Sequence, residues 1–184
     1  MLLEAFRDDP LTHYFIPPCD NWEELVSKYF AFRLRFGIMY GEAYAISPKI
    51  EGLAAWFAPG KSDMTNFRMM RAGGMALSRD MGKDIISRMN IIGEYISKIR
   101  KQHVTVPHWH LFPIAVDPAY QGKGFGSALL RPMLDRIAGD GLPCYLETQN
   151  EKNRSLYEHF GFKVIHTDTI PGINMKHWGM LKPP

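Results

Sequence analysis

The sequence lacks most features that mark secreted, membrane-spanning or metal-binding proteins. Its two cysteines, Cys19 and Cys144, lie far apart and without the spacing of metal ligands, so we expect buried free thiols in a reducing compartment. No apolar run approaches the roughly 18 residues of a transmembrane helix, and the N-terminal segment has no basic region of the kind that opens a signal peptide. The sequence therefore predicts a cytoplasmic protein that binds neither a membrane nor a metal ion.

A large excess of charge of one sign is also missing. The 184 residues carry a net charge of +3, with 22% charged and 46% hydrophobic residues, which is ordinary for a globular protein. This length accommodates one domain with a substantial core. The slight basic excess suits an anionic cofactor, but the chain has no basic stripe of the kind that binds nucleic acid. We therefore predict a single domain over residues 1–184 and no nucleic-acid partner.

Internal repeats and low-complexity linkers are absent as well, and the hydrophobic spacing changes between helical and strand periods along the chain. Apolar residues at helical spacing predict a helix over 21–36, which Asn21 is placed to cap. The further predicted elements are strands at 39–46 and 50–57, a helical segment at 63–100 broken near Gly73, a strand at 142–148, a helix at 153–160, and strands at 162–166 and 174–181. This order predicts a mixed α/β or α+β sheet with crossover connections in its C-terminal half.

The most informative segment runs from Trp109 to Gly126 and reads as a strand, a glycine-rich turn and the start of an amphipathic helix. Three glycines, at 122, 124 and 126, lie in the turn beside Gln121 and Lys123. Glycine lets the backbone adopt positive φ and approach a ligand closely. Because the N–H groups at a helix start attract anions, this segment predicts a phosphate-binding turn.

Two nucleotide motifs fit this turn poorly. A Walker loop needs the string Gly-x-x-x-x-Gly-Lys followed by Ser or Thr, and the chain contains no such string. A dinucleotide fingerprint needs a third glycine at position 127, where Ser127 stands, and the turn lies too late in the chain for the rest of that fold. We therefore disfavour a nucleotide-binding function.

The spacing Gln121-x-x-Gly124-x-Gly126 after an apolar strand resembles the acyl-CoA loop of the GNAT superfamily of N-acetyltransferases. A later segment resembles the second conserved segment of that superfamily, with Asn153, then Tyr157 one helical turn on, then Gly161-Phe162. Together the two segments cover about residues 108–166. The agreement of two separate motifs makes the resemblance specific.

This resemblance implies the GNAT fold: a central mixed and largely antiparallel sheet, splayed at the cofactor cleft and flanked by helices. Pro113 lies within the strand before the glycine turn and cannot donate to a sheet ladder, so we expect a bulge or splay there. The resemblance also implies that the pantetheine arm of acetyl-CoA binds the strand backbone. The expected cofactor-binding residues are Ile114, Ala115, Val116, Gln121, Gly122, Lys123, Gly124, Phe125, Gly126, Ser127 and Asn153.

The implied reaction is transfer of an acetyl group from acetyl-CoA to a primary amine by direct attack in a ternary complex. Tyr157 matches the tyrosine that acts as general acid in many members of the superfamily. For the base we predict His110, because histidine titrates near neutral pH. Glu147, on the neighbouring predicted strand, is an alternative, and some members use only water.

The acceptor is left open as a small-molecule or peptide amine. Aromatic residues such as Tyr29 and Trp178 either line a pocket or, more simply, belong to the core. A non-catalytic acyl-CoA-binding sensor is the alternative function, although the presence of Tyr157 disfavours it. A homodimer is left open as well.

Overall fold

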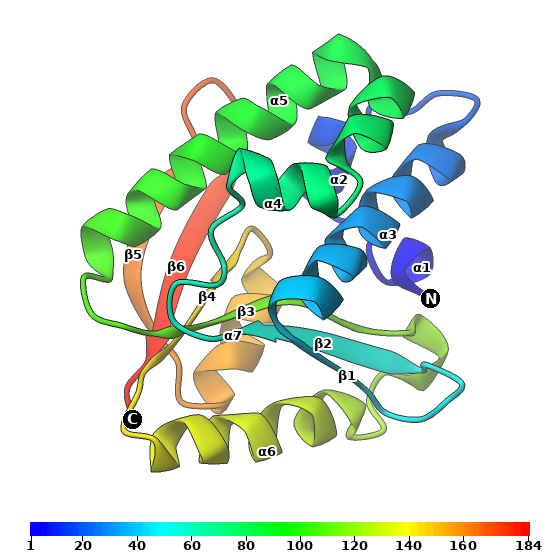
Figure 1. Cartoon of the computed structure of the whole chain (residues 1–184). Coiled ribbons are helices and arrows are strands. Elements are labelled where there is room, and N and C mark those ends of the chain that lie inside the picture. Colours follow the sequence, from blue (N-terminus) through cyan, green and yellow to red (C-terminus); the bar gives the residue numbers. More distant parts are fainter.

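Six strands form one mixed sheet in the computed structural model, which describes residues 1–184 (Figure 1). The strand order is β1-β2-β3-β4-β6-β5, and only the β3–β4 pair is parallel. The strands are β1 (Glu42–Ala45), β2 (Gly52–Phe57), β3 (Trp109–Val116), β4 (Cys144–Thr148), β5 (Lys163–Thr169) and β6 (Lys176–Lys182). This arrangement confirms the predicted mixed and largely antiparallel sheet.

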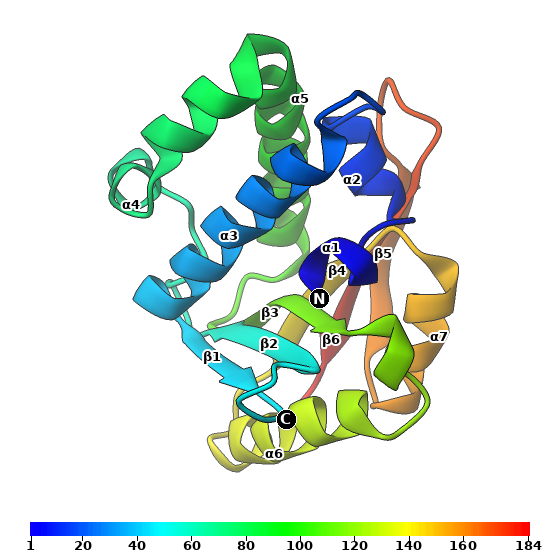
Figure 2. The same cartoon turned by 90° about the vertical axis from the view of Figure 1, so that its right-hand side faces the viewer.

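Helices cover both faces of the sheet (Figures 1 and 2). They are α1 (Leu2–Ala5), α2 (Pro10–Phe15), α3 (Trp22–Tyr40), α4 (Asn66–Arg71), α5 (Gly74–His103), α6 (Phe125–Gly139) and α7 (Glu151–His159). The alternation along β2 separates the layers: Ala54 and Trp56 belong to a core cluster with α6 and α7, whereas Ala55 and Phe57 pack with α3. No helix has both the length and the apolar character that crossing a membrane requires.

Several local predictions are confirmed and others are wrong. The break near Gly73 is confirmed, since that residue has φ +98° between α4 and α5. Asn21 precedes α3 but makes no side-chain capping hydrogen bond; its Oδ1 atom instead accepts a weak bond from the Cys19 thiol. Both cysteines are free, but only Cys144 is buried, so the prediction of burial is wrong for Cys19.

The central strands β3 and β4 part soon after they meet. Only Trp109 and His110 of β3 have partners in β4. On its other edge, β3 shifts register against β2 between the pairs Trp56–Leu111 and Ala54–Ile114. The shift leaves Pro113 in a bulge, as a residue without an N–H requires. The predicted bulge and splay are therefore confirmed.

Candidate active site

A cavity of about 70 Å³ lies where β3 and β4 separate. Its walls come from both faces of the sheet and from the N-terminal helices. Residues from β3, β4 and α7 that line it include Leu111, Ile114, Glu147, Thr148, Asn153 and Tyr157. Residues from α2, from α3 and from the segment before α2 include Phe6, Asp9, Phe15, Tyr29 and Phe30. The separation of the strands thus joins the two layers at one place.

Tyr157 reaches this cavity from α7. Its ring is 8% exposed and packs edge-on against Phe162, with the ring centroids 5.9 Å apart. Burial raises the pKa of the Tyr157 hydroxyl above its ordinary value. The hydroxyl is therefore protonated at neutral pH and can donate a proton to a departing anion.

Glu147 reaches the cavity from β4, on the opposite face from the neighbouring core residue Leu146. Burial raises the pKa of the Glu147 carboxyl, but the neighbouring His110 and Arg100 outweigh burial and lower the pKa to about 2. The cavity wall therefore carries an ionised carboxylate at neutral pH.

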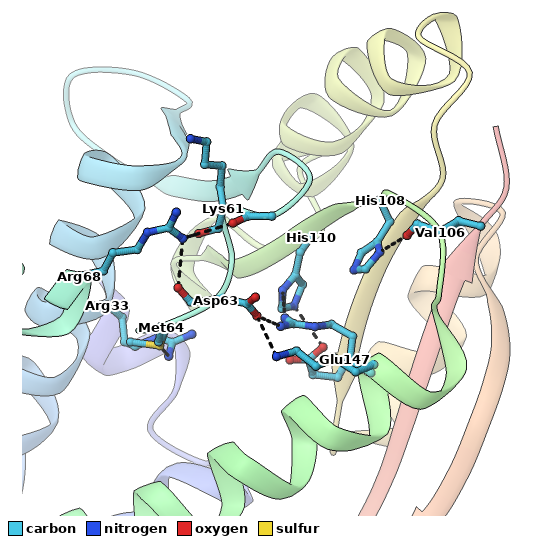
Figure 3. A network of polar contacts seen from close by, with 12 residues as sticks. Arg33, Lys61, Asp63, Met64, Arg68, Val106, His108, His110 and Glu147 are labelled. Carbon is cyan, nitrogen blue, oxygen red and sulfur yellow. Dashed lines mark hydrogen bonds and ion pairs between the residues drawn. The ribbon is translucent and has the colours of Figure 1, made fainter. Parts of the chain in front are cut away.

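His110 lies behind Glu147 and does not line the cavity. Its Nε2 atom is 3.1 Å from Oε2 of Glu147, and its Nδ1 atom is 2.7 Å from Nη1 of Arg100. Arg100 also donates to Oδ1 of Asp63 at 2.9 Å. Figure 3 shows Asp63, His110 and Glu147 in this network.

The glycine turn follows β3 directly and opens α6. Gly122 and Gly124 have φ of +74° and +84°, so the predicted left-handed conformations are confirmed at these two residues. Gly126 instead lies in the first turn of α6. A Cβ atom added at any of the three glycines would meet no other atom within 4 Å, so this side of the turn is open to a ligand.

The backbone of this turn has unused donors. None of the N–H groups of residues 122–127 donates to a carbonyl of the chain. Those of 125–127 belong to the first turn of α6, where an α-helix leaves its N–H groups free. A run of free donors at the positive end of a helix is suited to bind a pyrophosphate.

Two polar side chains hold the turn in shape. Gln121 Nε2 donates to the carbonyl oxygen of Val116 at 3.2 Å. Lys123 Nζ donates to the carbonyl oxygen of Ala119 at 3.0 Å and lies 4.8 Å from the ring centroid of Tyr120. Both side chains therefore bind the turn itself in the structure.

The structure gathers some of the residues predicted from the sequence and separates others. Tyr157, Asn153 and Ile114 share the cavity with the alternative base, Glu147. Asn153 does not cap α7, because the cap is Asn150, which accepts from the N–H of Lys152. Sequence reasoning missed Arg100 and Asp63, which no motif marks, and it missed the wall that α2 and the segment before it provide.

Known proteins resemble this chain in sequence and fold. The family model described as "Acetyltransferase (GNAT) family" matches residues 72–162. An uncharacterized N-acetyltransferase of Schizosaccharomyces pombe is 26% identical over 169 residues, covering 88% of this chain and 67% of that protein. A mycothiol acetyltransferase of Acidimicrobium ferrooxidans is 33% identical over 81 residues, which are 42% of this chain but 26% of that protein.

Among solved structures, one described as histone acetyltransferase HPA2 and related acetyltransferase from Corynebacterium glutamicum has a TM-score of 0.66. It is 23% identical and covers 100% of this chain and 87% of its own, so this likeness concerns the fold. The matched family segment spans α5, β3, the glycine turn, α6, β4 and α7, which include most of the cavity residues described above. Residues 72–162 of this chain belong to the GNAT acetyltransferase family.

Proposed function

We propose that this protein transfers an acetyl group from acetyl-CoA to a primary amine by direct attack in a ternary complex. One observation carries the proposal: the separation of β3 and β4 brings Tyr157 and Glu147 into one cavity, and the turn that follows β3 has a run of free N–H groups. An acid, a carboxylate and an anion site are the parts that the reaction needs.

The proposed cofactor site has two parts. The N–H groups of residues 122–127 would bind the pyrophosphate, with the charge of Lys123 at the rim. The edge of β3 facing β4 has no strand partner beyond His110, so the backbone of Ile114–Val116 is available to the amide groups of pantetheine. Asn153 lies in the cavity wall with Tyr157.

In the proposed reaction the neutral amine nitrogen attacks the thioester carbonyl carbon and forms the new C–N bond. Collapse of the tetrahedral intermediate breaks the C–S bond and releases the thiolate of CoA. Tyr157 gives its hydroxyl proton to this thiolate, and the proton lost by the amine passes through water to the carboxylate of Glu147. Solvent then returns a proton to Tyr157 and removes one from Glu147.

Of the two bases considered from the sequence, we propose Glu147 as the direct acceptor. Arginine only donates hydrogen bonds, so the contact with Arg100 occupies the lone pair of His110 Nδ1. His110 would then carry its proton on Nε2, which faces Glu147. We therefore assign His110 an indirect role, through Glu147.

The acceptor is proposed as a small-molecule or peptide amine. One relative is named for mycothiol, but that match covers 26% of its length. The N-terminal helices, which shape one side of the cavity, are therefore the place to expect specificity for the acceptor.

A screen of amines tests this proposal. Release of the free thiol of CoA would be followed with acetyl-CoA and a panel of amino acids, peptide N-termini, polyamines and arylalkylamines. At least one amine should accelerate thiol release, with initial rates that give intersecting double-reciprocal lines, as a ternary complex requires. Tight binding of acetyl-CoA without release for any amine would favour the sensor instead, and parallel lines would contradict direct transfer.

A further inference from the structure

Residues far from the glycine turn in the sequence belong to the polar network behind the cavity. The antiparallel strands β2 and β3 are neighbours, and a hairpin loop between such strands usually has about 2–5 residues. Here residues 58–108 intervene and contain α4 and α5. From this insertion Asp63 and Arg100 reach the polar network behind the cavity.

The contacts form a chain of four side chains from solvent to the cavity. The Asp63 side chain is 42% exposed, whereas that of Arg100 is 9% exposed. The side chains of His110 and Glu147 are 8% and 13% exposed. Each contact in the chain is 3.1 Å or shorter, so one exposed carboxylate anchors a buried guanidinium that in turn contacts the imidazole.

The hydrogen-bond donors and acceptors of these groups determine which nitrogen of the His110 imidazole carries the proton. A guanidinium has five N–H donors and no acceptor, so His110 Nδ1 accepts from Arg100 and cannot carry a hydrogen. The ring proton must then lie on Nε2, on the side of Glu147 Oε2. A second ring proton would have to displace Arg100 from Nδ1.

We propose that Arg100, anchored by Asp63, is a positioning residue that holds His110 as the neutral Nε2–H tautomer and thereby orients the carboxylate of Glu147 for the reaction. This inference rests on the proposed function for its kinetic consequence, but not for the tautomer itself. A neutral imidazole lowers the pKa of a nearby carboxyl less than a charged one does, so this tautomer leaves Glu147 a stronger base. Arg33 and His177 also lie near enough to Glu147 to influence it, and neither contacts His110 by a hydrogen bond.

The tautomer can be measured without any substrate. Long-range ¹H–¹⁵N correlation spectra of the protein labelled at histidine distinguish the two neutral tautomers, and His110→Gln identifies the signals of this ring. The wild-type protein at neutral pH should show the Nε2–H pattern, and Arg100→Gln should show a mixture of tautomers or a protonated ring. An Nδ1–H or doubly protonated ring in the wild type would overturn the proposal, whether or not the variant folds.

Kinetics then test the positioning role once an acceptor is known. Misplacement of a reacting group lowers kcat, so Arg100→Gln should reduce kcat by about 10- to 100-fold and leave the KM for acetyl-CoA nearly unchanged. Lys98→Gln is the matched control, because Lys98 is an exposed cation on the same helix without an ion pair, and it should keep the wild-type kcat.

Asp63→Asn keeps an oxygen acceptor for Arg100 and should keep both the tautomer and most of the rate. An Arg100→Gln variant with the wild-type tautomer, or with the wild-type kcat, would overturn the proposal. Absence of activity toward all amines would instead refute the proposed function and leave the tautomer result intact.

Discussion

Two side chains reach the cavity from opposite faces of the sheet, and the separation of β3 from β4 lets them meet. Tyr157 comes from α7, which shares a core cluster with α6. Glu147 alternates with Leu146 along β4 and so faces the other layer. A continuous sheet would keep an acid from one face and a carboxylate from the other apart.

The role of Tyr157 is tested by removing one oxygen atom. Tyr157→Phe keeps the ring that packs against Phe162 but removes the proton donor. Because a general acid typically contributes about 10²-fold or more, kcat should fall by about that factor while acetyl-CoA still raises the thermal midpoint. Unchanged turnover across the pH range would show that the thiolate leaves without help from this residue.

His177 makes stability depend on pH. The side chain is 0% exposed, and Nδ1 accepts from Gln149 at 2.8 Å. Burial lowers the pKa of His177 below the 6.5 of an unfolded chain. As the pH falls through the pKa of the unfolded chain, the unfolded state therefore binds more protons than the folded state. The contribution of His177 to the free energy of unfolding is complete above that pKa and declines as the solution is acidified.

The measurement is the thermal midpoint at about pH 7.5 and about pH 5.5, in the wild type and in His177→Gln. The midpoint of the wild type should fall on acidification, and the fall should be smaller in the variant. Some fall should persist, because burial also lowers the pKa of His108 and His166. An identical fall in both proteins would contradict the assignment to His177.

Among the elements, the glycine turn and α6 form the proposed anion site. Gly124 is the N-cap of α6 at φ +84° and has no side-chain cap, so the first N–H groups of the helix remain free. For an L residue the left-handed conformation costs about 1–2 kcal/mol. A side chain at this position would therefore strain the turn and hinder the approach of a ligand to the N–H groups.

Gly124→Ala should accordingly weaken acetyl-CoA binding, measured by calorimetry, with a smaller loss of stability. Gly139→Ala is the matched control, since Gly139 is the last residue of α6, has ordinary helical φ and has open space around it. It should bind acetyl-CoA as the wild type does and be as stable or slightly more so, by up to about 1 kcal/mol. Equal affinities in the two variants would argue against the turn as the pyrophosphate site.

Local features of the elements could be predicted from the sequence, and contacts over long separations could not. Pro113 predicts the bulge because it has no N–H, and the glycine spacing predicts the turn because few residues tolerate its conformation. The ion pair of Arg100 with Asp63 joins residues 37 apart in the chain, and no local pattern encodes it. The short helices α1 and α2 were missed because too few turns are present to show a period.

For the whole molecule, we predict selective stabilisation by CoA compounds. A ligand that binds only the folded state raises the thermal midpoint. At 100 times its Kd such a ligand adds about 2.7 kcal/mol to the free energy of unfolding. Acetyl-CoA and CoA should raise the midpoint, whereas NAD and ATP should not, because the turn lacks both the Walker string and the third glycine of a dinucleotide site. Stabilisation by NAD or ATP alone would contradict the assignment of the donor.

In the proposed reaction the acetyl group passes directly to an amine within this cavity. Mass spectrometry of the protein and the amine, after mixing with acetyl-CoA that carries a deuterated acetyl group, tests this transfer. We expect labelled acetyl on the amine, equimolar free CoA, and no acetylated protein when the amine is omitted. Accumulation of an acetylated protein, or release of CoA with the label appearing only as free acetate, would contradict it.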